Sequence, residues 1–394
     1  MYSKKRHIIT VLVACVITFV ITAALALGVV ITVNLHSGID IVVAAREMVR
    51  ENYVDQLSEQ QISDMNEAAI GAMVASLKDP YSYYFNADMY DQFQENSEEE
   101  YVGIGITIEY SDIEKVARVS SVNRGGPAEK AGVIFGDILL GADELTVEKH
   151  GYEAIVDHIK NGKKGEKVTV HISRASTDAS EKKSIEIVRE VITVETIEAE
   201  MLDDGIAYIK ISNFQHNSVE HFAKALFDVE KNGATGMVID LRGNPGGYAD
   251  SVIKMTDMLL PEGTIAYLED NKGRKEYFES DENCIDIPMA VLINESTASA
   301  AELMTGSLQA YDKAVVVGKK SFGKAVAQAP FMLTEETAIY LTTARYYTPK
   351  GECIDKKGIT PDIEIDLPAE QKAQLSTLSY AEDVQLQAAI TAIK

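Results

Sequence analysis

The spacing of apolar and polar residues differs from one segment of the chain to the next. In the first segment, polar residues show no periodic spacing. Residues 8–33 are an apolar run without a charge, preceded by the basic residues Lys4, Lys5 and Arg6. A helix of that length is about 39 Å long, whereas a hydrocarbon core is roughly 30 Å thick. Residues 1–34 therefore predict a cytoplasmic basic tail and a transmembrane anchor, with everything after about Asn34 outside the membrane.

The same segment could be confused with a cleaved signal. A secretory signal peptide usually has a shorter apolar core and a small-residue cleavage site, so an uncleaved anchor is the better interpretation. The tripeptide Leu12-Val13-Ala14 before Cys15 matches a bacterial lipoprotein cleavage site. It falls inside the apolar run, and we interpret the match as accidental.

The next two segments have different periods. Residues 35–87 carry apolar positions at helical spacing up to about Ser76, followed by a turn at Asp79-Pro80, and predict a small helical region. Residues 88–190 alternate with period two and predict a compact β-rich module. Within that module, strands are expected at 101–108, 116–122, 135–140 and 167–173, and short helices at 126–132 and 152–159.

The remaining chain alternates strand and helix patterns. Strands are expected at 206–211, 236–241, 289–293, 315–318, 338–341 and 363–365, and helices at 219–232, 249–260 and 298–311. This alternation predicts an α/β core over residues 191–368, with helices packed on a mixed, partly parallel sheet. Residues 369–394 are expected to form a C-terminal helical tail.

Composition excludes several classes of function. The net charge of −24 argues against nucleic acid, because phosphates would be repelled. Outside the apolar run the cysteines are Cys284 and Cys353, which imply no disulfide framework, although one bridge between them is possible. Neither a metal-ligand spacing nor a phosphate-binding glycine loop is present, so we expect no metal and no cofactor.

Ser299 and Lys324 are the candidate nucleophile and base. Ser299 lies in the run Asn294–Glu302, and Lys324 follows twenty-five residues later in Ser321–Gln328. A lysine can accept the serine proton only when its amine is neutral, so its pKa must fall from about 10.4 to roughly 7 to 8, at a cost of about 4 kcal/mol.

Burial can supply a shift of that size, because a desolvated ammonium is disfavoured. The neighbours of Lys324 favour such burial. They are Val315, Val316 and Val317 upstream, and Phe322, Val326, Ala329 and Pro330 close by.

A histidine base is the alternative. Ser299 does not lie in the Gly-x-Ser-x-Gly turn that is typical of α/β-hydrolases. Of the seven histidines, His216 and His221, together with Asp240, remain a plausible base system.

Acyl transfer also needs donors for the developing oxyanion. The segment Asp240–Gly247 follows a buried strand and precedes a helix, and its glycines free the backbone amides to face a ligand. We expect Gly246 and Gly247 to supply donors, with the amide of Ala300 at a helix N-terminus as another.

The β-rich module resembles a PDZ domain. Gly103, Ile104, Gly105 and Ile106 stand where such domains have the loop that binds a terminal carboxylate, and the Pro127-Ala-Glu-Lys-Ala131 segment follows in the expected order. The resemblance implies that the loop binds a peptide's C-terminus and that the next strand pairs with the peptide.

The chain as a whole resembles the carboxy-terminal processing, or tail-specific, proteases. The motifs that carry the resemblance are Asp79–Ser82, the Gly103–Ile106 loop, Asp240–Gly247, Ser299, Phe322–Lys324, Gln328 and Gly358–Asp362. The departures are small: Ala325 stands for a frequent glycine, Ser296-Thr297 for a Gly-Ser, and Ala301 for a serine. The resemblance implies a protease core with an inserted PDZ domain, and it implies that Gln328 helps to hold the lysine.

The expected function is therefore that of a serine endopeptidase outside the cytoplasmic membrane, single-pass and anchored by the N-terminal helix. Its partners would be proteins or peptides with apolar C-terminal tails, and it could form a homo-oligomer. The alternative is a non-catalytic, membrane-anchored PDZ adaptor on a protease-like scaffold, which would hold tails without cleaving them.

Overall fold

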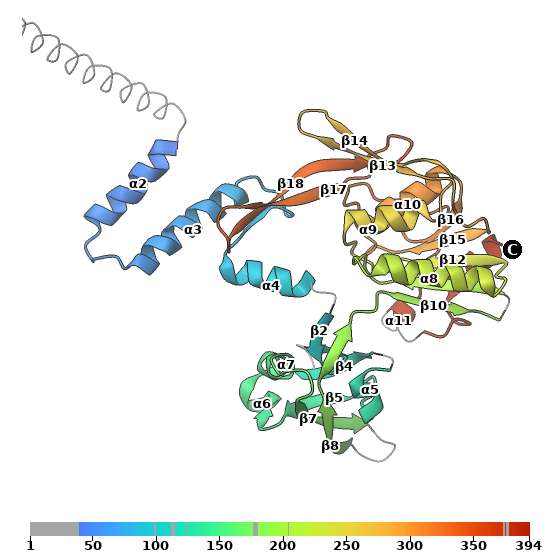
Figure 1. Cartoon of the computed structure of the whole chain (residues 1–394), viewed down its shortest axis with the longest axis horizontal. Coiled ribbons are helices and arrows are strands. Elements are labelled where there is room, and N and C mark those ends of the chain that lie inside the picture. Colours follow the sequence, from blue (N-terminus) through green and yellow to red (C-terminus); the bar gives the residue numbers. More distant parts are fainter. Residues whose placement is uncertain are drawn as a thin grey trace, which may run out of the picture. The chain divides into compact units, whose positions relative to one another are not determined.

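The computed structural model describes residues 39–97, 100–111, 115–123, 125–175, 180–203, 205–372, 375 and 378–394. Figure 1 shows the helices and strands, with colours that follow the sequence. The predicted anchor at residues 8–33 lies outside the described residues. Within the described ranges, no helix is long and apolar enough to cross a membrane.

One compact unit contains the described residues up to Asn86 together with residues 331–340. Its described elements include helices α2 (Ile39–Asn52) and α3 (Glu59–Ala75), which confirm the predicted helical pattern. Ser58 begins α3 with a capping box, in which its hydroxyl accepts from the Gln61 amide and the Gln61 side chain accepts in return. Strand β1 (Tyr83–Phe85) pairs antiparallel with residues 338–340.

The second unit holds residues 87–330 and 341–394, and it includes the β-rich module. This module follows helix α4 (Ala87–Ser97). A sheet of order β3-β4-β5-β7-β8 is its centre, with β6 paired to β5, and β2 pairs separately with β9. The bounds are β2 Glu100–Gly103, β3 Ile106–Ser111, β4 Val116–Val122, α5 Pro127–Ala131, β5 Ile138–Ala142, β6 Leu145–Thr146, α6 Val147–His150, α7 Tyr152–Lys160, β7 Lys167–Ala175, β8 Ser180–Val188 and β9 Glu190–Thr193.

One prediction for this module was wrong. The expected single strand at 101–108 is two strands, β2 and β3, that belong to different sheets. The chain changes direction between them because Gly105 has a φ of +74°, which is a glycine conformation, and Ile104 is buried in the core. The periodicity is continuous through the break, so the pattern alone did not reveal it.

The α/β part is built on a six-stranded sheet of order β10-β11-β12-β15-β16-β19. Strand β10 is antiparallel to β11, and the other pairs are parallel. This confirms the predicted mixed, partly parallel sheet. The strands are β10 Ile197–Met201, β11 Ile206–Ile211, β12 Gly236–Asp240, β15 Met289–Ile293, β16 Ala314–Gly318 and β19 Ile363–Glu364.

Alternate residues of these strands face two different helical layers. Ile209, Ile239 and Val291 pack with α8 (Ser218–Lys231), α9 (Ala249–Asp257) and α10 (Ala300–Ala310). Their neighbours in the sequence, such as Val238 and Leu292, pack with α12 (Val384–Ala392) on the other face. The predicted helical tail contains α11 (Ala369–Lys372) and α12, and α12 is thus part of the core.

A second sheet of order β1-β18-β13-β14, with β17 paired to β18, was mostly missed by the pattern. Strands β13 (Gly263–Asp270), β14 (Lys275–Ser280) and β17 (Val326–Met332) were not predicted, and β18 (Ala338–Tyr347) is longer than expected. Residues of β14 are mainly exposed and polar, and it pairs with β13 across a short turn. Such strands lack the apolar run that marks a buried strand.

Candidate active site

Ser299 lies at the carboxyl edge of the parallel sheet. Strand β15 ends at Ile293, and Ser299 is the residue that caps the N-terminus of α10. Its φ of 57° and ψ of −119° lie in a region that non-glycine residues rarely adopt. Strained backbone of this kind persists only when its surroundings fix it, and it is frequent at functional sites.

The glycine loop, residues 241–247 after β12, lies directly against Ser299. A Cβ atom placed on Gly246 would lie 2.8 Å from the Ser299 Cβ and 3.0 Å from the Ala300 amide nitrogen. Gly246 also has a φ of +110°, so no other residue fits there. The structure therefore brings together two segments that the sequence separates by more than fifty residues.

The amides predicted to stabilise the oxyanion differ in whether they already donate a hydrogen bond within the protein. The Gly246 N–H donates to the Oδ1 atom of Asn244 at 2.8 Å, so it is engaged within the loop. Asn244 is fully buried, and its side chain also donates to the carbonyl of Ile211. The amides of Gly247 and Ala300 are the two predicted donors that remain for an incoming oxygen.

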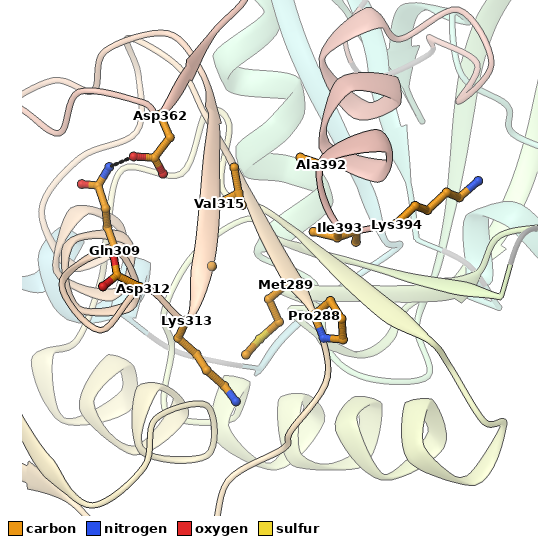
Figure 2. Close-up of a pocket in the computed structure, with 11 residues that line it drawn as sticks. Pro288, Met289, Gln309, Asp312, Lys313, Val315, Asp362, Ala392, Ile393 and Lys394 are labelled. Atoms are coloured by element: carbon orange, nitrogen blue, oxygen red, sulfur yellow. Dashed lines mark hydrogen bonds between the residues drawn. The ribbon is translucent and has the colours of Figure 1, made fainter.

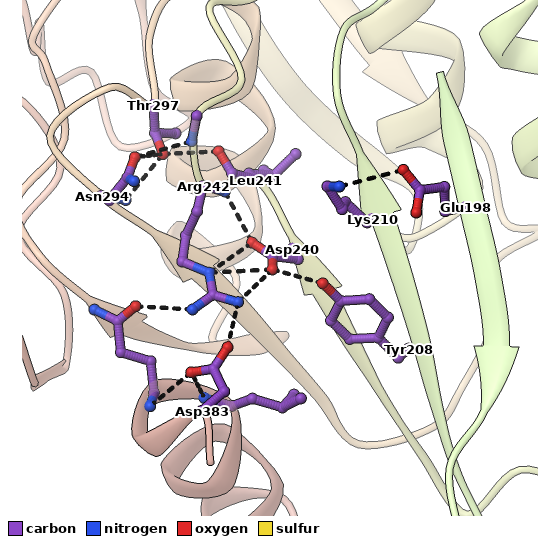
Figure 3. Close-up of polar contacts among 12 residues, drawn as sticks. Glu198, Tyr208, Lys210, Asp240, Leu241, Arg242, Asn294, Thr297 and Asp383 are labelled. Atoms are coloured by element: carbon purple, nitrogen blue, oxygen red, sulfur yellow. Dashed lines mark hydrogen bonds and ion pairs between the residues drawn. The ribbon is translucent and has the colours of Figure 1, made fainter. Parts of the chain in front are cut away.

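Further hydrogen bonds join the glycine loop to the serine loop, residues 294–299 between β15 and α10. The Ala298 N–H donates to the Asn244 carbonyl at 2.9 Å, and the Thr297 hydroxyl donates to the Leu241 carbonyl at 2.8 Å. The Gly243 N–H donates to the Asn294 side chain at 2.9 Å. Figure 3 shows Thr297 and Asn294 beside Leu241.

A buried ionic cluster anchors the start of the glycine loop. Figure 3 shows the Arg242 guanidinium between the carboxylates of Asp240 and Asp383, with ion-pair distances of 2.6 and 2.7 Å. The Tyr208 hydroxyl donates to Asp240, and Arg242 also donates to Gln385. Burial opposes the charge on Arg242, but the two carboxylates outweigh it and hold its pKa above the ordinary value. Helix α12, which Asp383 caps, is thereby tied to the loop.

This cluster weakens the histidine alternative. The Asp240 carboxylate binds Arg242 and Tyr208, so it is not placed to orient His216 or His221. The His216 ring instead stacks on Tyr248 at 4.0 Å and lies 3.5 Å from the Asp250 carboxylate, on an exposed surface.

Lys324 lies in the loop between β16 and β17, beside the serine loop. The neighbouring Phe322 N–H donates to the Thr297 carbonyl at 3.0 Å, which joins the two loops. Lys324 is half-buried, and Val326 is buried, as predicted, whereas Pro330 is exposed. Phe322, however, is 57% exposed and contributes less to a dry environment than predicted.

Glu302 holds both candidate catalytic residues by their amides, and sequence reasoning missed it. Its Oε2 atom accepts from the Ser299 N–H at 2.9 Å and from the Lys324 N–H at 2.8 Å. Its Oε1 atom accepts from the Gly323 N–H and the Ser321 hydroxyl. The side chain is fully buried, and burial raises the pKa of the carboxyl although these hydrogen bonds oppose the shift. A glutamate three residues into a predicted helix was the available signal.

Tyr346 in β18 contacts the same two residues from their carbonyl sides. Its hydroxyl lies 2.8 Å from the Ser299 carbonyl oxygen and 2.8 Å from the Lys324 carbonyl oxygen. The Tyr346 amide also donates to the Ala325 carbonyl. Nothing in the local sequence marked this tyrosine, because it is one of eighteen and lies almost fifty residues from Ser299.

Gln328 lies in β17, two residues after Val326. Its side-chain amide donates to the Val326 carbonyl and the Thr342 hydroxyl, each at 3.3 Å. These bonds fix the side chain between β17 and β18. Its contact with Lys324 stays a prediction.

In the β-rich module, the four predicted peptide-binding residues line one small pocket of about 50 Å³. Helix α7 provides Val156, Ile159 and Lys160 on the other side. The lining is mainly apolar, with one lysine at the end of the helix. This matches the groove between a strand and a helix in which a terminal residue would lie.

A larger pocket, of about 490 Å³, lies at the opposite ends of the core strands (Figure 2). Its lining includes Met289 and Ala314, which begin β15 and β16, and Ile393 after α12. Ser299 and Lys324 instead follow the carboxyl ends of these strands. The pocket in Figure 2 is therefore separate from the candidate active site.

Comparisons with known families agree with this geometry. Residues 205–365 match the model of peptidase family S41, and residues 92–173 match the PDZ domain. Residues 32–89 match the N-terminal domain of the activating protease CtpB. Ser299 and Lys324 lie inside the peptidase match.

Curated relatives decide the assignment. The carboxy-terminal processing protease CtpA of Bacillus subtilis is 34% identical over 82% of this chain and 68% of its own length. The chain belongs to peptidase family S41. The carboxyl-terminal-processing protease of Synechocystis is 31% identical over 87% of this chain and 80% of its own length.

The fold agrees with that of a solved C-terminal processing protease. The photosystem II D1 C-terminal processing protease has a TM-score of 0.51 and 25% identity, and the match covers 88% of this chain and 98% of that one. The predicted family, the serine-type peptidase activity, the protease fold and the PDZ domain are thus confirmed.

Proposed function

We propose that this S41 protease cleaves proteins with a Ser299–Lys324 dyad after its PDZ domain has bound their C-terminal tails. The observation that carries the proposal is the shared oxygen of Glu302, which accepts the amides of both Ser299 and Lys324. A serine and a lysine held by one buried atom keep a fixed separation. Such a fixed pair is what nucleophile activation requires.

The proposed reaction uses these residues in the following order. The Ser299 Oγ attacks the scissile carbonyl and gives its proton to the neutral Lys324 amine, while the amides of Gly247 and Ala300 stabilise the oxyanion. The tetrahedral intermediate collapses, and the protonated lysine gives the proton to the leaving amine. Water then hydrolyses the acyl-enzyme by the same route, with Lys324 again as base.

The PDZ pocket favours small, apolar terminal residues. Its volume of about 50 Å³ and the apolar side chains of Ile104, Ile108 and Ile159 leave little room for a large side chain. The backbone from Gly103 to Ile106 would bind the carboxylate. Substrates are therefore proteins with apolar C-terminal tails, and an amidated tail should bind more weakly.

We also propose that residues 8–33 anchor the protease in the cytoplasmic membrane with its catalytic part outside. Support comes from the charge-free apolar run and the basic residues before it. If this is correct, the full-length protein should sediment with membranes, and externally added protease should digest it in spheroplasts. Recovery in the soluble fraction would contradict the anchor.

Four variants of the full chain in detergent test the dyad. Ser299→Ala should abolish cleavage of an unfolded protein with an apolar tail. Lys324→Arg should be as inactive as Lys324→Ala, because arginine keeps the charge but cannot accept a proton at any pH that a protein survives. His216→Ala should remain active. An active Lys324→Arg variant together with an inactive His216→Ala variant would contradict the dyad.

The adaptor alternative predicts a different result. A non-catalytic adaptor would bind the tail but leave the protein uncleaved in the wild type as well as in Ser299→Ala. Tail binding measured beside cleavage therefore separates the two functions.

A further inference from the structure

Tyr346 is a buried titratable group to which the dyad mechanism gives no role. It lies near the end of β18, is 5% exposed, and directs its hydroxyl at two backbone carbonyls. Those carbonyls belong to Ser299 and Lys324, each at 2.8 Å. A phenol has one hydrogen, so this hydrogen is shared between the two acceptors.

The arrangement complements that of Glu302. Glu302 accepts the N–H groups of Ser299 and Lys324, and Tyr346 donates to the C=O groups of the same two residues. Both peptide groups that flank each residue are therefore fixed by a buried side chain. The direction in which a side chain leaves its Cα atom depends on these peptide planes.

The Ser299 carbonyl has other donors, because the amides of Glu302 and Leu303 also reach it at 2.9 and 3.0 Å. Lys324 lies in a loop rather than at a helix N-terminus, and the Tyr346 hydroxyl is a side-chain donor to its carbonyl. Without this bond, Lys324 would keep the Glu302 contact on its amide side and lose the Tyr346 contact on its carbonyl side.

Tyr346 keeps its proton over the working pH range. Burial raises its pKa well above the ordinary value, and electrostatic interaction with Glu302 and Asp355 acts in the same direction. The hydroxyl is therefore a permanent donor to both carbonyls.

We propose that Tyr346 is a positioning residue for the dyad, which fixes Lys324 relative to Ser299 through their carbonyl groups. This inference rests on the proposed Ser299–Lys324 mechanism. Tyr346 does not touch the substrate in this role, so its loss should act on kcat and on the apparent pKa of the base rather than on KM.

Tyr346→Phe in the full chain tests the proposal, with Tyr347→Phe as the matched control. Tyr347 is the next residue of the strand, and its ring stacks on Tyr267 at 4.8 Å, away from the dyad contacts. Tyr346→Phe should lower kcat by about 10- to 100-fold, the range expected when a catalytic group is displaced by up to about 1 Å, with KM nearly unchanged. Tyr347→Phe should resemble the wild type.

The pH dependence of Ser299 labelling by a fluorophosphonate gives a readout that a merely structural role would not change. Labelling requires the neutral lysine, and a lysine that relaxes towards water has a pKa closer to its ordinary value. The midpoint should therefore move to higher pH in Tyr346→Phe. Tyr346→4-aminophenylalanine, which restores an N–H donor, should recover most of the activity and the original midpoint.

Three outcomes overturn the proposal. The first is a Tyr346→Phe enzyme with wild-type kcat and midpoint. The second is a loss of activity that only follows a loss of folded protein, while the folded fraction keeps the wild-type midpoint. The third is a well-folded Tyr346→4-aminophenylalanine enzyme that recovers neither the activity nor the original midpoint. Ser299→Ala and Lys324→Ala run alongside: if they remain active, the dyad itself fails, whereas inactive dyad variants with a normal Tyr346→Phe enzyme reject the positioning role alone.

Discussion

Two glycine-containing loops of this protease have proposed roles in cleavage and in tail binding, and they need their glycines for different reasons. At Gly246 a Cβ atom would collide with Ser299, whose strained backbone is fixed on both sides. At Gly103 a Cβ atom would lie 2.7 Å from a ring carbon of Tyr101, a side chain that is not fully buried and can rotate. The proposed catalytic loop thus packs against fixed backbone, whereas the proposed tail-binding loop packs against a side chain that can move.

Gly246→Ala is the test of this contrast with the largest expected effect on cleavage. The added methyl group must displace Ser299 or the glycine loop, so cleavage should fall by at least about 100-fold. The matched control is Gly243→Ala in the same loop, where φ is also positive but nothing lies within 4 Å of the new atom. Steady-state cleavage of both variants is the measurement. Equal activities would show that backbone strain, rather than the approach to Ser299, makes glycine necessary.

A second test asks whether the rigidity of the glycine loop depends on α12. Asp383→Ala leaves Arg242 with one carboxylate in a buried site and removes the cap of α12, so the free energy of unfolding should fall by about 3–5 kcal/mol. Urea unfolding measures it. Asp250→Ala removes an exposed ion pair and should change stability little. Similar losses in both would mean that the buried cluster does not hold the loop.

Glu302→Gln tests the amide side of the dyad. The glutamine has one acceptor oxygen for four donors, so the unfolding free energy should fall by roughly 1–3 kcal/mol and cleavage should weaken.

The pH dependence of stability gives the second readout for this carboxyl. Because its pKa is raised in the folded protein, its contribution to stability is present below the ordinary value of 4.5 and is lost as pH rises through the folded pKa. Glu302→Gln should lack this fall. A wild-type protein without such a decline between pH 4.5 and neutrality would argue against a raised pKa.

The smallest effect is expected in the PDZ loop. Gly103→Ala should weaken binding of a fluorescent apolar tail by less than about tenfold, or about 1.4 kcal/mol, since the Tyr101 ring can move. Cleavage of a short peptide that bypasses the PDZ domain should not change. Fluorescence polarisation with free and amidated tails measures the first effect, and a complete loss of binding would show that this loop is as constrained as the catalytic one.

Several features were predictable because they depend on local pattern. The helices after Asn217 and Tyr248 and the buried strand at Gly236–Asp240 follow from apolar periodicity, and the structure places them within a few residues of expectation. Strand β14 was missed because an exposed strand that pairs with one neighbour carries no buried run. The break at Gly105 was missed because a single glycine does not change the period.

The sequence by itself determined the family, the α/β order of the core and the candidate chemistry of Ser299 and Lys324, because these depend on motifs of a few neighbouring residues. The tertiary structure alone decided what surrounds that chemistry. Glu302 accepts from the amides of both residues, and Tyr346 donates to their carbonyls. The Gly246 amide donates to Asn244, and Asp383 ties α12 to the glycine loop. Each of these contacts, except the Glu302–Ser299 and Gly246–Asn244 bonds, joins residues far apart in the chain, and a buried polar group accepts whichever partner the packing brings to it.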